Sequence, residues 1–274
     1  MPTLRELKKR LNSIKTTEKI SAAMKTVASA KLSKVSKVLE SYRAYERASA
    51  ETLELFGNEL SQAVCQKNPN APVCYVVMAS NRGLCGGYNL ELLNYADEIV
   101  SGDPESMVIT VGKHATCHFE GRYTACFSLP DVPTSDTCAE LIEYLLGLYN
   151  GGEISRLVFI YQQYKNTLVQ TPASKPILPL EAPSENGKTD MICLPDRATV
   201  VHSAAISLVR SSMLASFLEV ASGAQAATLN AMKSACDNAK ESRQKLEVKI
   251  YRSRQASVTQ SVLETSVDFS ENDW

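Results

Sequence analysis

The sequence predicts an α/β protein in which two very long helices, one at each end of the chain, flank a middle segment of strands and helices. The two ends contain almost no glycine or proline and carry apolar residues at helical spacing. The middle alternates short apolar runs with amphipathic stretches, which is typical of βαβ units and a mainly parallel sheet. With 274 residues, 44% of them hydrophobic, the chain can bury a substantial core.

The N-terminal segment, residues 3–56, has neither glycine nor proline. Its first apolar side chains follow alternating steps of three and four, which is the spacing of a coiled coil, at Leu4, Leu7, Leu11 and Ile14. The stripe continues less regularly through Ile20, Met24, Val27, Ala28, Leu32, Val35, Leu39 and Tyr42. At 1.5 Å per residue, this segment predicts a helix about 80 Å long.

The middle segment predicts short buried strands at residues 73–79, 107–111, 157–161 and 168–171. It predicts helices at residues 89–100 and 135–149. Glycine and proline separate these elements, for example at Gly151 and Gly152 and in the predicted loop at residues 182–188.

The C-terminal segment, residues 199–267, has no proline and one glycine, Gly223, and it follows the start signals Pro195 and Asp196. Its seam consists mostly of small residues, namely Ala221, Ala224, Thr228, Met232, Ala235, Ala239, Ser242 and Leu246. Small side chains let two helices approach closely, so we expect this helix, about 100 Å long, to pack against another helix.

The two terminal helices are too long to stand apart in water, so we expect them to pair as an antiparallel coiled coil rising from the middle domain. The expected boundaries are residues 1–60 and 196–274 for the coiled-coil helices and 61–195 for the globular domain. Counting along both helices ends the first one opposite residue 253 or so, at about 1.5 Å per residue. Residues 254–267 would then project alone, and a partner outside the chain should enclose this polar, marginal helix.

Charge is distributed unevenly, although the net charge is only −1. Residues 1–37 hold ten Lys or Arg and two Glu, and residues 233–254 hold seven Lys or Arg and three acids. Two interpretations remain open: a solvated helix face, or a basic shaft surrounded by an acidic protein. Nucleic acid ranks below an acidic protein, because no aromatic residue interleaves the basic ones before Tyr42.

No uninterrupted apolar run approaches the roughly 18 residues needed to cross a bilayer, and the first residues have no signal-peptide pattern. We therefore expect the protein to stay in the compartment where it is made. No C-x-x-C pair occurs among the eight cysteines, which stand at positions 65, 74, 85, 117, 126, 138, 193 and 236. Reduced thiols are expected.

Residues 80–89, SNRGLCGGYN, form a glycine-rich turn between a predicted strand and a predicted helix, where many proteins bind a phosphate. Gly83, Gly86 and Gly87 do not fit G-x-G-x-x-G, and no Lys-Ser or Lys-Thr follows to complete a P-loop. The turn is therefore interpreted as structural, and no cofactor is expected.

His114 and His118, with Cys117 between them, have a spacing that can bind a metal from one helix face. No fourth ligand is obvious, so we interpret them as ordinary helix residues and expect no metal site. No Ser–His–Asp arrangement or paired-carboxylate motif stands out, and no catalytic residue is predicted.

Four stretches together resemble the gamma subunit of F-type ATP synthases. They are LKKRLNSIKTTEKISAAMKTVASAKL near the N-terminus, the turn SNRGLCGGYN, and QAATLNAMKSACDNA and RQASVTQ near the C-terminus. They occur in the order and spacing of that family. The resemblance implies a rotor shaft without a catalytic site of its own: a long antiparallel coiled coil of the N- and C-terminal helices on a Rossmann-like α/β domain.

The resemblance also implies the partners. Three alpha and three beta subunits would surround the coiled coil, and the epsilon subunit and the membrane c ring would meet the globular foot. Ion flow would turn the c ring and the shaft, and the shaft would drive the beta sites through different affinities. No nucleic acid is expected, membrane contact is expected only through the c ring, and the implied location is the cytoplasmic face of a bacterial plasma (inner) membrane.

The contacts with beta implied by motif are Met24, Arg254, Gln255 and Thr259. Gln255 and Thr259 are four residues apart, so they share one helix face and can offer hydrogen bonds to a passing loop. The family's foot turn, near the epsilon contact, corresponds here to Arg82, Gly83, Gly86 and Gly87.

The sequence departs from the family pattern at Asn81, where an acid is usual, and at Ala224, Thr228 and Tyr251, where glutamate, arginine and asparagine are usual. Its C-terminal tail also lacks the usual glycines. These departures leave individual contacts open, above all any ion pair made through the arginine that Thr228 replaces.

Two other interpretations remain. A dinucleotide-dependent enzyme would need an acidic ribose ligand about 20 residues after the glycine turn. Asp103 lies near that distance but in a predicted loop, and the long helices would have no role. A coiled-coil nucleic-acid protein would show DNA binding with a steep salt dependence, which the near-neutral charge of the whole chain does not favour.

Overall fold

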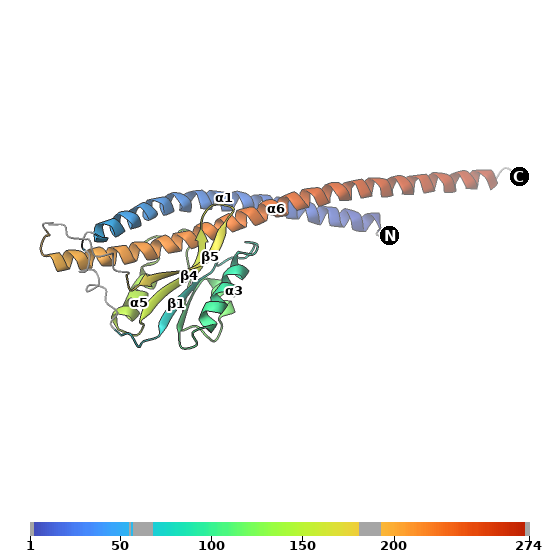
Figure 1. The fold of residues 1–274 in the computed structure, drawn as a ribbon. Coiled ribbons are helices and arrows are strands. Elements are labelled where there is room, and N and C mark those ends of the chain that lie inside the picture. Colours follow the sequence, from blue (N-terminus) through green and yellow to red (C-terminus); the bar gives the residue numbers. More distant parts are fainter. Residues whose placement is uncertain (1–2, 55, 57–67, 181–192, 272–274) are drawn as a thin grey trace. The chain divides into compact units, whose positions relative to one another are not determined.

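The computed structural model describes residues 3–54, 56, 68–180 and 193–271 (Figure 1). The loop predicted at residues 182–188 and Cys65 lie outside the described residues. The chain divides into two compact units: unit 1 comprises residues 1–27 and 231–274, and unit 2 comprises residues 28–230. Both terminal helices run through both units, and each unit is described here by itself.

The two long helices are α1, Leu4–Glu54, and α6, Arg197–Glu271. At the start of α1, the Thr3 N–H donates to Glu6 Oε2 (2.9 Å) and the Glu6 N–H donates to Thr3 Oγ1 (3.3 Å), which is a capping box. At the start of α6, Asp196 accepts hydrogen bonds from the hydroxyl (2.7 Å) and the N–H (2.9 Å) of Thr199, which hold the pKa of Asp196 below its usual value. The two predicted terminal helices are confirmed, and each end falls within a few residues of its predicted position.

Unit 2 contains a five-stranded sheet with the strand order β3-β2-β1-β4-β5. The strands are β1 Val73–Met78, β2 Met107–Val111, β3 Ala125–Phe127, β4 Arg156–Tyr164 and β5 Gln170–Leu178. The first four are parallel, and β5 pairs antiparallel with β4. The predicted mainly parallel sheet is confirmed. The strand predicted at 168–171 begins two residues later and is much longer, and β3 has no counterpart among the predicted strands.

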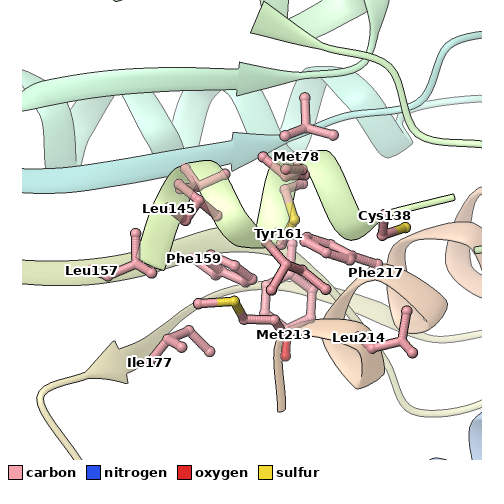
Figure 2. Close-up of a cluster of buried hydrophobic side chains, with 14 of the residues drawn as sticks. Met78, Cys138, Leu145, Leu157, Phe159, Tyr161, Ile177, Met213, Leu214 and Phe217 are labelled. Atoms are coloured by element: carbon pink, nitrogen blue, oxygen red, sulfur yellow. The ribbon is translucent and has the colours of Figure 1, made fainter. Parts of the chain in front are cut away.

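Helices cover both faces of the sheet (Figure 1). Helices α3, Tyr88–Ser101, and α4, Lys113–His118, pack on one face; α5, Ala139–Asn150, and the unit 2 parts of α1 and α6 pack on the other. Side chains of β4 alternate between these layers, so that Phe159 and Tyr161 belong to the α6 side and Ile160 to the α3 side. Phe159 stacks on Phe217 of α6 with ring centroids 5.6 Å apart (Figure 2). This packing attaches α6 to the sheet.

Among the described residues, one helix, α6, contains a window long and apolar enough by length and composition to cross a membrane. The mean hydropathy of the window is 1.4, and 72% of it is buried within the protein, which is typical of a core helix. Polar residues interrupt this window, so it contains no uninterrupted apolar run of membrane-spanning length.

Candidate functional site

In unit 1, α1 and α6 run antiparallel. Arg243 Nε of α6 lies 3.0 Å from Glu18 Oε2 of α1, and Glu247, one turn further along α6, lies 3.6 Å from Lys15 Nζ. The partners progress in opposite directions along the two helices, as antiparallel pairing requires. All side chains from residue 254 to residue 263 are exposed, which is the exposure expected of a stretch that projects beyond the partner helix.

The buried seam of α1 differs from the prediction. Ile20, Met24 and Val27 were predicted to continue the apolar stripe, but their side chains are 56%, 36% and 52% exposed. Steps of three and four continued without a break from Ile14 instead reach Glu18, Ser21, Lys25 and Ala28, which are buried or half-buried. The prediction was wrong because it followed apolar residues rather than the unbroken heptad spacing.

The seam of α6 needs a smaller correction. Of the predicted seam residues, Ala239 and Leu246 are buried but Ser242 is exposed. The half-buried position is the next residue, Arg243, so the heptad on this helix also includes a charged side chain.

Both helices of unit 1 carry exposed apolar residues at helical spacing. On α1 these are Ile20, Met24 and Val27, which we name the α1 outer stripe. On α6 the steps of three and four pass through Val248, Tyr251, Gln255, Val258 and Val262, the α6 outer stripe, all of them exposed. Apart from Gln255, the residues of both stripes are apolar, and exposed apolar surface that is contiguous is a candidate for contact with a partner.

The remaining family-derived contact residues lie on the C-terminal part of α6, level with the first turn of α1 or beyond it. Arg254, Gln255 and Thr259 are all exposed. The Thr259 hydroxyl donates to the backbone oxygen of Gln255 (2.9 Å), so its donor is used within the helix and only its acceptor capacity faces outward. Arg254 makes no ion pair within the part of the chain that the structure describes.

The surface of unit 1 is strongly basic along α1. Arg5, Lys8, Lys9, Arg10, Lys15 and Lys19 all have exposed side chains. Two basic helices lie side by side here, and an acidic partner surface would offset their mutual repulsion.

The glycine turn belongs to unit 2 and is held by its own polar side chains. The Ser80 N–H donates to Asn89 Oδ1 (3.1 Å), the Asn89 amide donates back to Ser80 Oγ (2.9 Å), and Ser80 Oγ donates to the backbone oxygen of Arg82 (2.6 Å). Asn89 lies in the first turn of α3, so this network ties the end of β1 to the start of the helix.

The glycines of the turn have different roles. Gly86 has a φ of +62°, a region that strains most other residues. Gly83 and Gly87 do not require a left-handed backbone. At Gly87, Glu91 Oε1 lies 3.1 Å from the place of an added Cβ, so a carboxylate already lies against the first turn of α3. A phosphate at this helix terminus would meet that negative charge, which supports a structural turn.

Asn81 joins the turn to two neighbouring segments. Its amide donates to the backbone oxygen of Leu129 (2.6 Å) and to Ser128 Oγ (3.2 Å), and its Oδ1 accepts from the Lys113 N–H (3.2 Å). An aspartate, the residue usual in the family, has no donor in its ionised form. The departure at Asn81 is therefore matched by local acceptors.

Arg82, beside it, is 73% exposed and lies 3.7 Å from Asp131 Oδ2. Asp131 also pairs with Lys31 of α1. The hydrogen bond from Lys31 and the nearby positive charges hold the pKa of Asp131 below its usual value. The turn is thereby connected to α1 through one carboxylate.

The departures at Ala224 and Thr228 form one interaction. The Thr228 hydroxyl donates to the backbone oxygen of Ala224 (2.8 Å), one turn earlier in α6. The hydroxyl carries no charge and is satisfied inside the helix. Thr228 therefore cannot form any ion pair that an arginine would form at this position. Tyr251, a third departure, is 72% exposed on the α6 outer stripe.

The histidine motif lies on α4. His118 Nε2 contacts Asp97 Oδ2 of α3 at 2.7 Å. Among the described residues, no three His, Cys, Asp or Glu side chains gather in a way that could hold a metal ion. Six described cysteines carry free thiols, namely Cys74, Cys85, Cys117, Cys126, Cys138 and Cys236. Burial raises the pKa of Cys74 to about 12.

Among the described residues, three ion pairs join the long helices, and sequence reasoning missed the two more sheltered ones as well as Lys15–Glu247. Glu18 pairs with Arg243 in unit 1, and Arg43 pairs with Glu219 in unit 2. For the first pair, the sequence indicates the position of Glu18, four residues after Ile14 at a heptad position, but not its partner, which lies 225 residues away. For the second pair, the sequence indicates neither position, and the partners are 176 residues apart.

Known proteins give a consistent comparison. A family model described as ATP synthase matches residues 3–266. The ATP synthase gamma chain of Pelotomaculum thermopropionicum is 30% identical over 96% of this chain and 97% of its own length, and that of Clostridium novyi is 30% identical over 94% of each. A chain of the Euglena gracilis mitochondrial ATP synthase, from a structure of OSCP/F1/c-ring, covers 98% of this chain with a TM-score of 0.69 and 18% identity, which is a likeness of fold. The chain belongs to the ATP synthase gamma chain family.

Proposed function

We propose that the chain is the rotor shaft of an F-type ATP synthase. In this role it is a non-catalytic central-stalk subunit that couples ion flow through a membrane c ring to ATP synthesis or hydrolysis at alpha/beta sites. The observation that carries the proposal is the surface of unit 1. There, two antiparallel helices present outer apolar stripes and a dense basic face, and the stretch from residue 254 to residue 263 is exposed throughout. A helix of this kind needs an enclosing partner to be stable.

The partners follow from family membership and from this surface. Three alpha and three beta subunits would enclose unit 1, and the epsilon subunit and the c ring would bind the globular part in unit 2. Membrane contact would be through the c ring alone, at the cytoplasmic face of a bacterial inner membrane, and ion transport would be a property of the whole complex. No cofactor, metal or nucleic acid is required of this chain.

Contacts with beta would be made by Met24 of the α1 outer stripe and by Arg254, Gln255 and Thr259 on the C-terminal part of α6. The exposure of all four supports this assignment. Each orientation of the shaft would present these side chains to a different beta subunit. Differential contact of this kind is what biases one beta conformation over another. The foot turn, with Arg82, Gly83, Gly86 and Gly87, would position the adjoining contact surface in unit 2.

The test is reconstitution. The full chain is mixed with separately purified alpha and beta subunits of the same source, and native mass spectrometry and ATPase rate are recorded together. We expect one copy of the chain in a complex with three alpha and three beta subunits, and ATP hydrolysis that requires it. A chain that stays free under these conditions while binding NAD or DNA would overturn the proposal. A variant ending at residue 253 is the matched control, and it should assemble less well.

A further inference from the structure

The seam of unit 1 changes character at a single level, where Glu18 of α1 meets Arg243 of α6. Continuing the observed register by antiparallel helix geometry places Leu11 level with Ile250 and Ile14 level with Leu246, which makes apolar layers. On the other side of the pair, Ser21 is level with Ala239 and Lys25 with Cys236. That side has small or polar layers, which bury little apolar surface.

The contacts at this level form a network of four side chains, which we name the seam network: Lys15, Glu18, Arg243 and Glu247. Arg243 Nε lies 3.0 Å from Glu18 Oε2, Arg243 Nη1 lies 3.3 Å from Glu247 Oε1, and Lys15 Nζ lies 3.6 Å from the same oxygen. Glu18 and Arg243 are 21% and 29% exposed, whereas Lys15 and Glu247 are 46% and 40% exposed. Glu18 and Arg243, which stand at heptad positions, are thus less exposed than Lys15 and Glu247, which lie at the edge of the seam.

Apolar and small layers specify the register of two helices weakly, because they are similar after a shift by one heptad. The ion pair is different. A shift of seven residues in one direction would place Glu18 level with Ile250 and Arg243 level with Lys25, which has the same charge. A shift in the other direction would place Glu18 level with Cys236 and Arg243 level with Leu11. Both alternatives leave a sheltered charge without its counterion, which is costly.

We propose that the seam network fixes the register of α1 against α6 in unit 1 and contributes little to the stability of the coil. Lys15, Glu18, Arg243 and Glu247 are therefore positioning residues. By setting the register, they set the positions of the α1 outer stripe and the α6 outer stripe relative to each other. This inference concerns helix pairing within the chain, so it can be tested whether or not the proposed rotor function holds.

The test compares three forms of the full chain. They are the natural sequence, the double variant Glu18→Leu/Arg243→Leu, and a charge-reversed form with Lys15→Glu, Glu18→Arg, Arg243→Glu and Glu247→Arg. Each form also carries either of two cysteine pairs. Leu11→Cys with Ile250→Cys reports the observed register, and Leu11→Cys with Ser257→Cys reports a shift of one heptad. Disulfide formation is induced, and mass spectrometry of tryptic peptides locates each cross-link among the natural cysteines.

The natural and charge-reversed forms should form the Leu11→Cys/Ile250→Cys cross-link and almost none of the shifted one. The Glu18→Leu/Arg243→Leu form should melt at the same temperature or higher, because apolar replacement of a sheltered ion pair is often neutral or stabilising. Its shifted cross-link should rise at least tenfold over that of the natural sequence. An ion pair that only stabilised the coil would behave differently, because its removal would lower the melting temperature and leave the register unchanged.

Two outcomes overturn the inference. The first is a Glu18→Leu/Arg243→Leu form that keeps only the observed register, since packing elsewhere would then set it. The second is a form that melts well below the natural chain or does not fold, since the pair would then act through stability. If the charge-reversed form fails to fold, Arg243→Lys replaces it. That variant keeps the charge, and it should keep the single register.

Discussion

Arg43 of α1 and Glu219 of α6 form a sheltered ion pair within unit 2. Arg43 Nε lies 3.0 Å from Glu219 Oε1, and Arg43 Nη2 donates to the backbone oxygen of Tyr164 at the end of β4 (2.8 Å). The two side chains are 30% and 10% exposed. One guanidinium therefore joins three elements that are distant in the sequence.

Glu219→Ala should destabilise the chain by about 2–3 kcal/mol, because it leaves the partly sheltered Arg43 charge without its counterion. The expected loss lies at or below the low end of the range for fully buried pairs, since Arg43 retains some contact with water. Urea unfolding followed by far-UV circular dichroism measures the change. The double variant Arg43→Met/Glu219→Leu is the control and should lose much less. A loss below about 0.5 kcal/mol for Glu219→Ala would show that water already screens the pair.

Asn81→Asp should also destabilise the chain, although it restores the residue usual in the family. The amide of Asn81 donates to the backbone oxygen of Leu129, and an ionised carboxylate would place an acceptor against that acceptor. The expected cost is about 1–2 kcal/mol, measured as the shift in the urea midpoint. Ser128→Ala is the matched control. It removes only the hydroxyl that accepts the longer hydrogen bond from the Asn81 amide (3.2 Å), so it should cost less. An unchanged midpoint for Asn81→Asp would mean that the segment at residues 128–129 rearranges freely.

The fold was largely predictable from the sequence because its elements have local signals. The start of α6 follows from Asp196, the extent of α1 follows from a segment without glycine or proline, and β1 and β2 follow from short apolar runs. Strand β3 was not predictable, because three residues give no periodicity and its pairing with β2 is a tertiary contact. The antiparallel direction of β5 likewise depends on the hairpin that follows β4 and has no periodic signal.

The candidate site was predictable only in part, because its ion pairs, like the pairing of β3 with β2, join residues that are distant in the sequence. Motif similarity identified Met24 and Gln255, and the structure places both on exposed faces. The spacing of apolar residues, in contrast, led the predicted stripe through Ile20, because an apolar residue was preferred over the charged residue at the heptad position. Whether Glu18 belongs at a seam depends on Arg243, which lies 225 residues away, so a local pattern cannot identify the pair.

Gly112→Ala should prevent stable folding of unit 2. Gly112 follows β2 with a φ of +92°, and a Cβ built on it would clash with the backbone oxygen of Ala79. A backbone atom of the adjacent strand end cannot move away cheaply, so we expect a loss above about 3 kcal/mol, seen as low soluble yield and a lower melting temperature. Gly121→Ala is the control, because its φ is +81° but no atom lies within 4 Å of the added Cβ. It should cost about 1 kcal/mol, and equal losses for the two variants would contradict the steric explanation.

Thiol reactivity should separate the buried cysteines from the exposed ones. Burial raises the pKa of Cys74 to about 12 and also raises the pKa of Cys138, so both should resist a thiol reagent at pH 8, which reacts with thiolates. Cys117 and Cys126 are exposed and should react quickly. The variant Cys117→Ser/Cys126→Ser should therefore lose two fast-reacting equivalents in a timed assay with Ellman's reagent. A fast phase that persists undiminished would place the reactive thiols elsewhere.

Gln255→Ala tests the proposed contact with beta without disturbing the fold. The side chain is exposed, so the free energy of unfolding should change by no more than about 0.5 kcal/mol, and the melting temperature should change little. In the reconstituted complex, however, the variant should lower the stall torque and the efficiency of ATP-driven ion pumping, because its amide is the exposed donor next to the internally bonded Thr259. Asn238→Ala is the matched control, since Asn238 is also an exposed amide on α6 but lies about a quarter of a turn away from the face of the α6 outer stripe. Pumping that is unchanged in Gln255→Ala, or equally reduced in both variants, would remove Gln255 from the contact surface while leaving the rotor assignment to the assembly experiment.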